Sequence, residues 1–251
     1  MRWLAVLIAG FVAGAATILL TNPGSSVQPP AATAAAQVNT GVSTGVPGAQ
    51  NPDEGAENLP DQPLDAATRA QLAAQLTEAR ALALRYPTVT DALQGGYHLA
   101  GGFAPGTGAH YVSYSGLSGQ GAVDPNRPEA LIYDGTSPTS QIAGLMYYAM
   151  TPQQPEGFAG PNDHWHRHRG VCVQYSAAGI SVPLPADADV TAAQCAAVNG
   201  SYLGVTGWMV HAWVVPGWES PQGVFSHDNL HLYCPGNTYI TNAIGFCVRQ
   251  S

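Results

Sequence analysis

The sequence predicts a mainly β protein of the α+β class, an antiparallel β-sandwich or open barrel preceded by an N-terminal amphipathic helix. Three observations support this fold class. Six segments after residue 96 are short and rich in aromatic and β-branched residues. Gly, Pro, Asn and Asp separate them, as they do in turns between strands. Before residue 96, by contrast, the apolar residues recur with the period of a helix.

The helix is predicted over residues 65–86, DAATRAQLAAQLTEARALALRY. Asp65 is a favourable N-cap residue, and Pro87 cannot continue the helix. The apolar face is formed by residues at helical spacing: Leu72, Leu76, Ala79 and Ala83. A second, shorter helical turn is expected over residues 89–93, before a Gly-Gly break.

The six predicted strands lie between residues 109 and 234. They are AHYVSY (109–114), EALIYD (129–134), QIAGLMYYAM (141–150), HWHRHRGVCVQY (164–175), GWMVHAWVV (207–215) and LHLYC (230–234). One late helix is expected as well, because Thr191 and Gln194 have the spacing of a capping box and Gly200 can end it.

The chain is expected to have three parts. Residues 1–22 contain WLAVLIAGFVAGAATILL, an uncharged run close to the length that spans a bilayer, which predicts a transmembrane anchor or a signal segment. Residues 23–64 are rich in Pro, Gly and Ala, which predicts a disordered linker. Residues 65–251 are expected to form a single globular domain, membrane-anchored or secreted, on the extracytoplasmic side, because Arg2 favours a cytoplasmic N-terminus.

Four cysteines lie in the predicted domain: Cys172, Cys195, Cys234 and Cys247. An even number of cysteines in an oxidising compartment predicts two disulfides. Among the three pairings that four cysteines allow, we expect that of sequence neighbours, Cys172 with Cys195 and Cys234 with Cys247. A reduced cysteine acting as a nucleophile or metal ligand is the alternative, which the absence of a CxxC motif disfavours.

Charge and motifs exclude several classes of function. The chain has no lysine and eight arginines against sixteen acidic residues, with a formal charge of -8. This balance argues against a nucleic-acid partner and excludes Schiff-base chemistry on lysine. The sequence also lacks HExxH, GxSxG, a phosphate-binding glycine loop and GxGxxG between a strand and a helix.

The stretch HWHRHRG places histidines at alternate positions: His164, His166 and His168. On a strand these side chains share one face, with neighbours about 6.5 to 7 Å apart. Two adjacent imidazoles can therefore bind one ion, whereas the third is about 13 Å from the first and needs a bend. We expect two of the three to be metal ligands. A solvated, charged ribbon on an edge strand is the alternative.

Further ligands are expected from other strands. His211 in WMVHAWVV and His110 in GAHYV lie in apolar surroundings, where an imidazole needs a hydrogen bond or a metal. His227 and His231 lie in a more polar stretch and are weaker candidates, and His98 is expected to be structural or exposed.

The ion is expected to be a transition metal. Imidazole suits copper and zinc, and iron or manganese is a further possibility. A thioether ligand from one of three methionines would favour copper. A carboxylate ligand, from Glu129 or Asp163, would favour zinc, iron or manganese. The methionines are Met146, Met150 and Met209.

An ordered series of motifs resembles a group of exported bacterial proteins of uncharacterised function. The series is YPTVTDALQGGYH, GAHYV, DPNRPEALIYDG, IAGLMYYAM and HAWVVPGWESPQGVFSHDNLHLYC, and it covers roughly residues 80–234. The shared positions are His110, Tyr111, Pro128, Glu129, Tyr133, His211, Trp213, Gly223, Phe225, Asn229 and Cys234. The resemblance implies that His110, Glu129 and His211 form a common centre suited to a metal, and it implies no particular activity.

Three functions are consistent with these patterns. The first is an extracytoplasmic, membrane-tethered protein that binds a transition metal through a histidine cluster. The second is a metal-dependent enzyme of cupin-like architecture, a hydrolase or an oxygenase, with an open coordination position. The third is a structural or interaction domain without a metal. The candidate ligands are His110, Glu129, His164, His166, His168 and His211.

Overall fold

The computed structural model describes residues 60–114, 123–176, 179–184 and 190–233, and the backbone alone of residues 54–55, 238–240 and 247–249. The helices are α1 (Ala66–Ala83), α2 (Val89–Gln94), α3 (Ala192–Ala197) and the 3-10 helix η1 (Leu230–Leu232). The strands are β1 (Glu54–Gly55), β2 (His98–Ala104), β3 (Gly108–Val112), β4 (Ala130–Tyr133), β5 (Ile142–Ala149), β6 (His166–Arg167), β7 (Arg169–Ser176), β8 (Gly179–Ser181), β9 (Ser201–Val205), β10 (Trp208–Ala212), β11 (Thr238–Ile240) and β12 (Cys247–Arg249).

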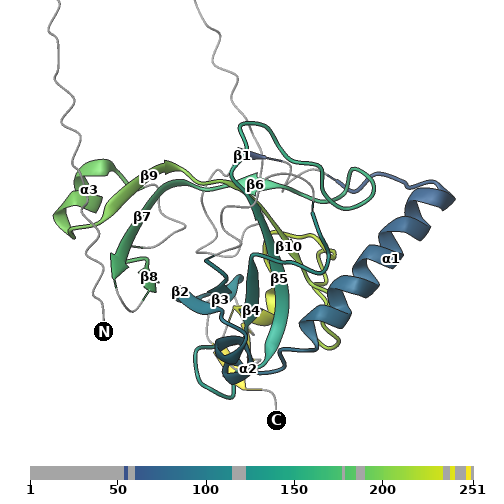
Figure 1. Ribbon diagram of the computed structural model, residues 1–251, viewed down its shortest axis with the longest axis horizontal. Coiled ribbons are helices and arrows are strands. Elements are labelled where there is room, and N and C mark those ends of the chain that lie inside the picture. The colour runs from purple at the N-terminus through teal and green to yellow at the C-terminus, as the bar shows by residue number, and fades with distance from the viewer. Residues whose placement is uncertain are drawn as a thin grey trace, which may run out of the picture. The chain divides into compact units, whose positions relative to one another are not determined.

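Helix α1 forms as the sequence predicts. The Asp65 carboxylate caps it by accepting hydrogen bonds from the backbone N–H groups of Ala67 and Thr68. The predicted apolar face packs on the domain core, and α1 lies alongside β5 (Figure 1). Helix α2 begins with a complete capping box between Thr88 and Asp91.

The fold is mainly β and is organised around a nearly closed barrel. The strand order in its sheet is β1-β6-β10-β5-β4-β3-β2-β8-β7-β9. Strands β6 and β7 are the two halves of one extended segment, separated only by His168. Because β6 pairs with β10 while β7 pairs with β8, and β8 pairs with β2, this bent segment closes the ring of strands.

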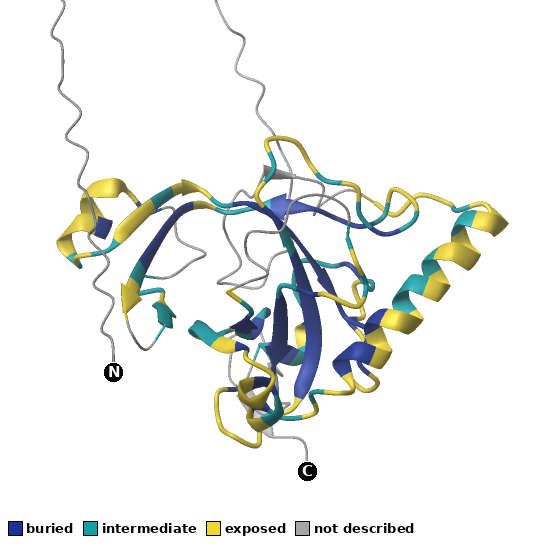
Figure 2. Ribbon diagram, viewed as in Figure 1, coloured by how far each residue is buried: buried dark blue, intermediate teal, exposed yellow. Residues whose placement is uncertain are grey.

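The core is formed by this curved sheet and the helix packed on it. Strands β4, β5 and β10 are buried along almost their whole length (Figure 2). Gly144 on β5 leaves room for the Trp213 ring, because a Cβ atom there would lie 2.6 Å from that ring. Aromatic edge contacts add to the core, as between Tyr111 and Tyr133, whose ring centroids are 5.2 Å apart.

The strand predictions were correct for five of the six segments and wrong for the last. Residues 230–232 of LHLYC form η1, because the Asn229 side chain accepts a hydrogen bond from the His231 N–H and caps a helical turn there. The sheet also contains strands that the sequence did not indicate: β1, β2, β8 and β9. The pairing of β2 with β8 is parallel, at Ala100 and Ile180, in an otherwise antiparallel arrangement.

A smaller apolar cluster lies under α3, β7 and β9. The disulfide between Cys172 and Cys195 joins β7 to α3, as predicted. Helix α3 has the predicted capping box, in which Thr191 and Gln194 bond each other's backbone. It ends at Ala197, before Gly200, and Asn199 beyond it has a left-handed φ of 55°. The predicted pairing of Cys234 with Cys247 lies outside the described side chains.

The predicted anchor or signal segment, residues 1–22, lies outside the described residues. Two residues of the segment predicted as a linker, Glu54 and Gly55, form β1 and pair with β6. Within the described part of the chain, no helix has the length and apolar character needed to cross a bilayer. The disulfide indicates that the domain matures in an oxidising environment.

Candidate metal centre

Five histidine side chains gather where β3, β6 and β10 meet the loop that follows β10. Neighbouring rings in this group have centroids 4.5 to 5.8 Å apart. The members, called the histidine cluster below, are His110, His166, His168, His211 and His227. The HWHRHRG stretch is not a solvated ribbon, because His166 has an exposed fraction of 0%.

Strand register brings His166 and His211 together. His166 on β6 is paired with Met209 on β10, so His211, two residues further on, lies on the same face as its diagonal neighbour. The ring centroids are 5.4 Å apart. Arg167, between two histidines of the cluster, lies instead with its guanidinium 4.4 Å from the centre of the Trp208 ring. Alternation along the strand thus directs histidine and arginine to different surroundings.

Barrel curvature brings His110 to His211. Strands β3 and β10 are separated in the sheet by β4 and β5, and in a flat sheet they would lie about 14 Å apart. The two Nε2 atoms are nevertheless 3.4 Å apart. Both side chains therefore point into the concave face of the sheet.

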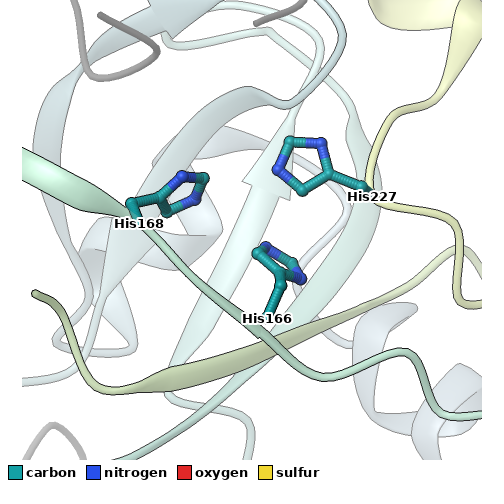
Figure 3. A group of neighbouring side chains, drawn as sticks. All are labelled: His166, His168 and His227. Carbon is teal, nitrogen blue, oxygen red and sulfur yellow. The ribbon is translucent and has the colours of Figure 1, made fainter. Parts of the chain in front are cut away.

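Three members of the cluster have ligand atoms close enough for one ion. These are His166, His168 and His227, whose nearest ring nitrogens all lie within 4.8 Å of one another. Figure 3 shows the three rings facing a common space, with His227 approaching from the loop opposite the strand. This group could hold a metal ion.

The hydrogen bonds of the rings fix which nitrogen carries the lone pair. His166 Nδ1 lies 3.3 Å from the His164 carbonyl oxygen, and His211 Nδ1 lies 2.7 Å from the His227 carbonyl oxygen. A carbonyl oxygen only accepts, so Nδ1 carries the proton and Nε2 the lone pair in each neutral ring. His227 Nδ1 donates in the same way to the Asp228 carboxylate at 2.7 Å. Such partners are typical of metal-binding histidines.

Burial keeps the centre of the cluster uncharged. Burial, and then the nearby rings of other cluster members, lower the pKa of His166 and of His211 well below 6.5. Burial and the same kind of neighbours lower the pKa of His110 to about 4. These rings are neutral at pH 7, and only a neutral imidazole can bind a metal.

Two predicted ligands have their contacts elsewhere. His164 Nε2 lies 2.7 Å from the carboxylate of Asp61, outside the cluster. The Glu129 carboxylate accepts a hydrogen bond from the Tyr148 N–H at 2.8 Å. The assignment of ligands remains a prediction, but the structure brings His110, His166, His168 and His211 together and adds His227.

The partly buried carboxyl of Glu129 predicts a pH-dependent stability. Burial raises its pKa from 4.5 to about 7. Between these pH values the folded protein keeps a proton that the unfolded chain has released, so stability falls as the pH rises. The free energy of unfolding of the wild type should fall between pH 4.5 and pH 8, and in Glu129→Gln this fall should be smaller by about 2 to 3 kcal/mol. The measurement is urea unfolding at the two pH values with a chelator present.

The control is the exposed Glu78, whose Gln variant should retain the wild-type pH dependence. An unchanged pH dependence in Glu129→Gln would contradict a neutral carboxyl at this position.

The methionines and the carboxylate considered as further ligands lie in different surroundings. Met209 and Met146 are buried and lie opposite His166 and His211 in the strand register. Met150 is exposed. Asp163 accepts a hydrogen bond from the Trp165 indole, and burial raises its pKa to about 6.

His227 belongs to the close group, although the sequence analysis treated it as a weaker ligand candidate. The stretch SHDNLHLYC is polar and predicts a loop, and a loop is where His227 lies. The adjacent Asp228 was the available signal, because a carboxylate beside a histidine can orient its ring toward a metal.

Comparison with known protein families, curated proteins and solved structures gives no match for this chain.

Proposed function

We propose that the protein binds a transition-metal ion through the imidazoles of His166, His168 and His227. The observation that carries the proposal is the convergence of three ring nitrogens within 4.8 Å. The Nε2 atom of His166 is buried and has no hydrogen-bond partner among the described residues. An imidazole nitrogen left in this state costs free energy, and a metal ion would compensate that cost.

The size of the group suits a small divalent ion. Imidazole nitrogens bind zinc at about 2.0 to 2.1 Å, so two of them on a tetrahedral ion lie about 3.3 Å apart. The three nitrogens would need to approach one another by at most about 1.5 Å. Neutral nitrogen donors favour Zn²⁺ or Cu²⁺ over Mg²⁺ or Ca²⁺, which prefer oxygen.

The direct test is a competition titration of chelator-stripped protein with Zn²⁺ and a chromophoric chelator. We expect tight uptake by the wild type and its loss in the double variant His168→Ala/His227→Ala. Zinc at 100 times its Kd should stabilise the wild type by about 2.7 kcal/mol. If zinc and copper leave the stability of the wild type unchanged, the domain is a structural or interaction module instead.

Asp228 is expected to act as a positioning residue for the metal. Its carboxylate accepts hydrogen bonds from His227 Nδ1 and from the Tyr233 hydroxyl, each at 2.7 Å. Asp228→Asn keeps the size of the side chain but loses its charge. We expect the zinc affinity to fall about 10- to 100-fold with unchanged stoichiometry, measured by the same competition titration.

Exposed Asp65 offers a matched control. Asp65→Asn makes the same change at the N-cap of α1, distant in sequence from Asp228, and should leave the zinc affinity unchanged. Equal zinc affinity in Asp228→Asn and wild type would show that the carboxylate does not orient His227.

A metal-dependent catalyst is the second candidate function. The close group has three members within the described part of the chain, and catalytic zinc sites typically have three protein ligands and an open fourth position. His168 and His227 are partly buried, whereas His166 is buried. An open position in the Cu²⁺ form should bind azide with a new charge-transfer band, and an unchanged spectrum would reject this candidate.

The proposed setting is the extracytoplasmic side of a membrane. The disulfide supports an oxidising compartment, and the uncharged run in residues 1–22 supports an anchor or a signal segment. Cell fractionation distinguishes the two: an anchored protein stays with the membrane after a high-salt wash, and a secreted one is found in the medium.

A further inference from the structure

The pair formed by His110 and His211 lies beside the proposed site but outside the group of three. Its Nε2 atoms are 3.4 Å apart, which is close to the separation of about 3.3 Å expected for two imidazole nitrogens on one tetrahedral ion. His211 has an exposed fraction of 2%, and His110 is partly buried.

A backbone carbonyl orients the His211 ring of the pair. His211 Nδ1 donates to the His227 carbonyl oxygen at 2.7 Å. The His211 Nε2 atom therefore carries a lone pair that points toward His110 Nε2.

Without metal, the two neutral rings share a hydrogen bond in which His110 Nε2 donates to His211 Nε2. A metal ion would take the place of that proton between the two nitrogens. A metal ion, bound by these two rings and completed by water, satisfies both nitrogens at the observed separation.

We propose that His110 and His211 form a second metal site, so that the histidine cluster holds two ions side by side. This inference rests on the proposed function of the neighbouring group. The two sites share His227, whose ring belongs to the first site and whose carbonyl oxygen orients His211 of the second. The rings of His166 and His211, one from each site, have centroids 5.4 Å apart.

The test uses the chelator-stripped full chain and Cu²⁺ alone, with uptake followed by electron paramagnetic resonance. We expect the wild type to take up two ions per chain, and the signal of an isolated Cu²⁺ to lose intensity as the second ion couples to the first. His110→Gln should take up one ion and give a full-intensity isolated signal. Exposed His98 provides the matched control, and His98→Gln should behave as the wild type.

Each outcome decides between the two sites. A wild type that saturates at one ion, with His110→Gln unchanged, would overturn the second site and leave the first in place, with the pair sharing a hydrogen bond. Two ions retained in both His110→Gln and His110→Ala would also overturn it, because the second ion would lie elsewhere. A wild type that binds no ion would overturn both proposals. The circular dichroism of each variant without metal verifies that it folds.

Discussion

Replacement of His166 by alanine is expected to weaken Zn²⁺ binding by more than about 100-fold, because even the loss of a residue that only orients a ligand costs about 10- to 100-fold. His166 is the fully buried member of the close group, and its Nε2 atom has no other partner among the described residues. The measurement is the competition titration, with the free energy of unfolding recorded with and without zinc. The variant should lose the zinc-induced stabilisation entirely.

Two further variants separate ligand loss from damage to the core. His98→Ala removes a histidine that is exposed and stacks on Tyr114, with ring centroids 5.3 Å apart, and it should bind zinc as the wild type does. His166→Phe fills the space of the imidazole, so it should fold without metal yet fail to bind zinc. Wild-type zinc affinity in a folded His166→Phe protein would show that the site lies elsewhere.

Removal of the disulfide is expected to cause the largest loss of stability. Cys172 and Cys195 are 23 residues apart in the sequence. Without the cross-link the unfolded chain gains entropy, and in the chain-entropy model this lowers the free energy of unfolding by about 3 kcal/mol for a loop of this length. The apolar cluster around the bond is small, since its buried members are the two cysteines and Val190. We expect the double variant Cys172→Ala/Cys195→Ala to lose about this amount in urea unfolding at neutral pH.

Hydrogen exchange shows where the stability is lost. Amides of α3 and β9 should exchange much faster in the double variant, while those of β4 and β5, in the barrel core, should follow the global free energy of unfolding. A loss below about 1 kcal/mol would indicate that packing alone holds this part of the chain.

Local signals made much of the fold predictable. The cap at Asp65 and the capping box at Thr191 act over three residues, so the sequence alone locates the starts of α1 and α3. Five strands were found from composition and bounding turns. Strand β9 was missed because it is short, largely exposed and contains a glycine, so its formation depends on pairing with β7.

Closure of the barrel could not be predicted. The extended segment that contains HWHRHRG breaks at His168, where it leaves β10 and turns to β8 and β9. Thr206 fixes this break, because its hydroxyl accepts a hydrogen bond from the His168 N–H and its own N–H donates to the His168 carbonyl. These contacts join residues 38 positions apart, which no local pattern reveals.

The candidate site was predictable in part for the same reason. Alternation in HWHRHRG indicates that neighbouring histidines share a face, and His166 and His168 do lie together. The approach of His110 to His211 depends on sheet curvature, and the approach of His227 depends on a loop. Both are consequences of the closed fold and not of any stretch of sequence.

The central claim is that the histidine cluster holds a metal ion, and the most direct test is anomalous diffraction from crystals equilibrated with Zn²⁺. Data collected on both sides of the zinc absorption edge should place a peak within bonding distance of a ring nitrogen of His166, His168 and His227. A peak at another position only, or crystals with bound zinc but no peak in the cluster, would contradict the claim.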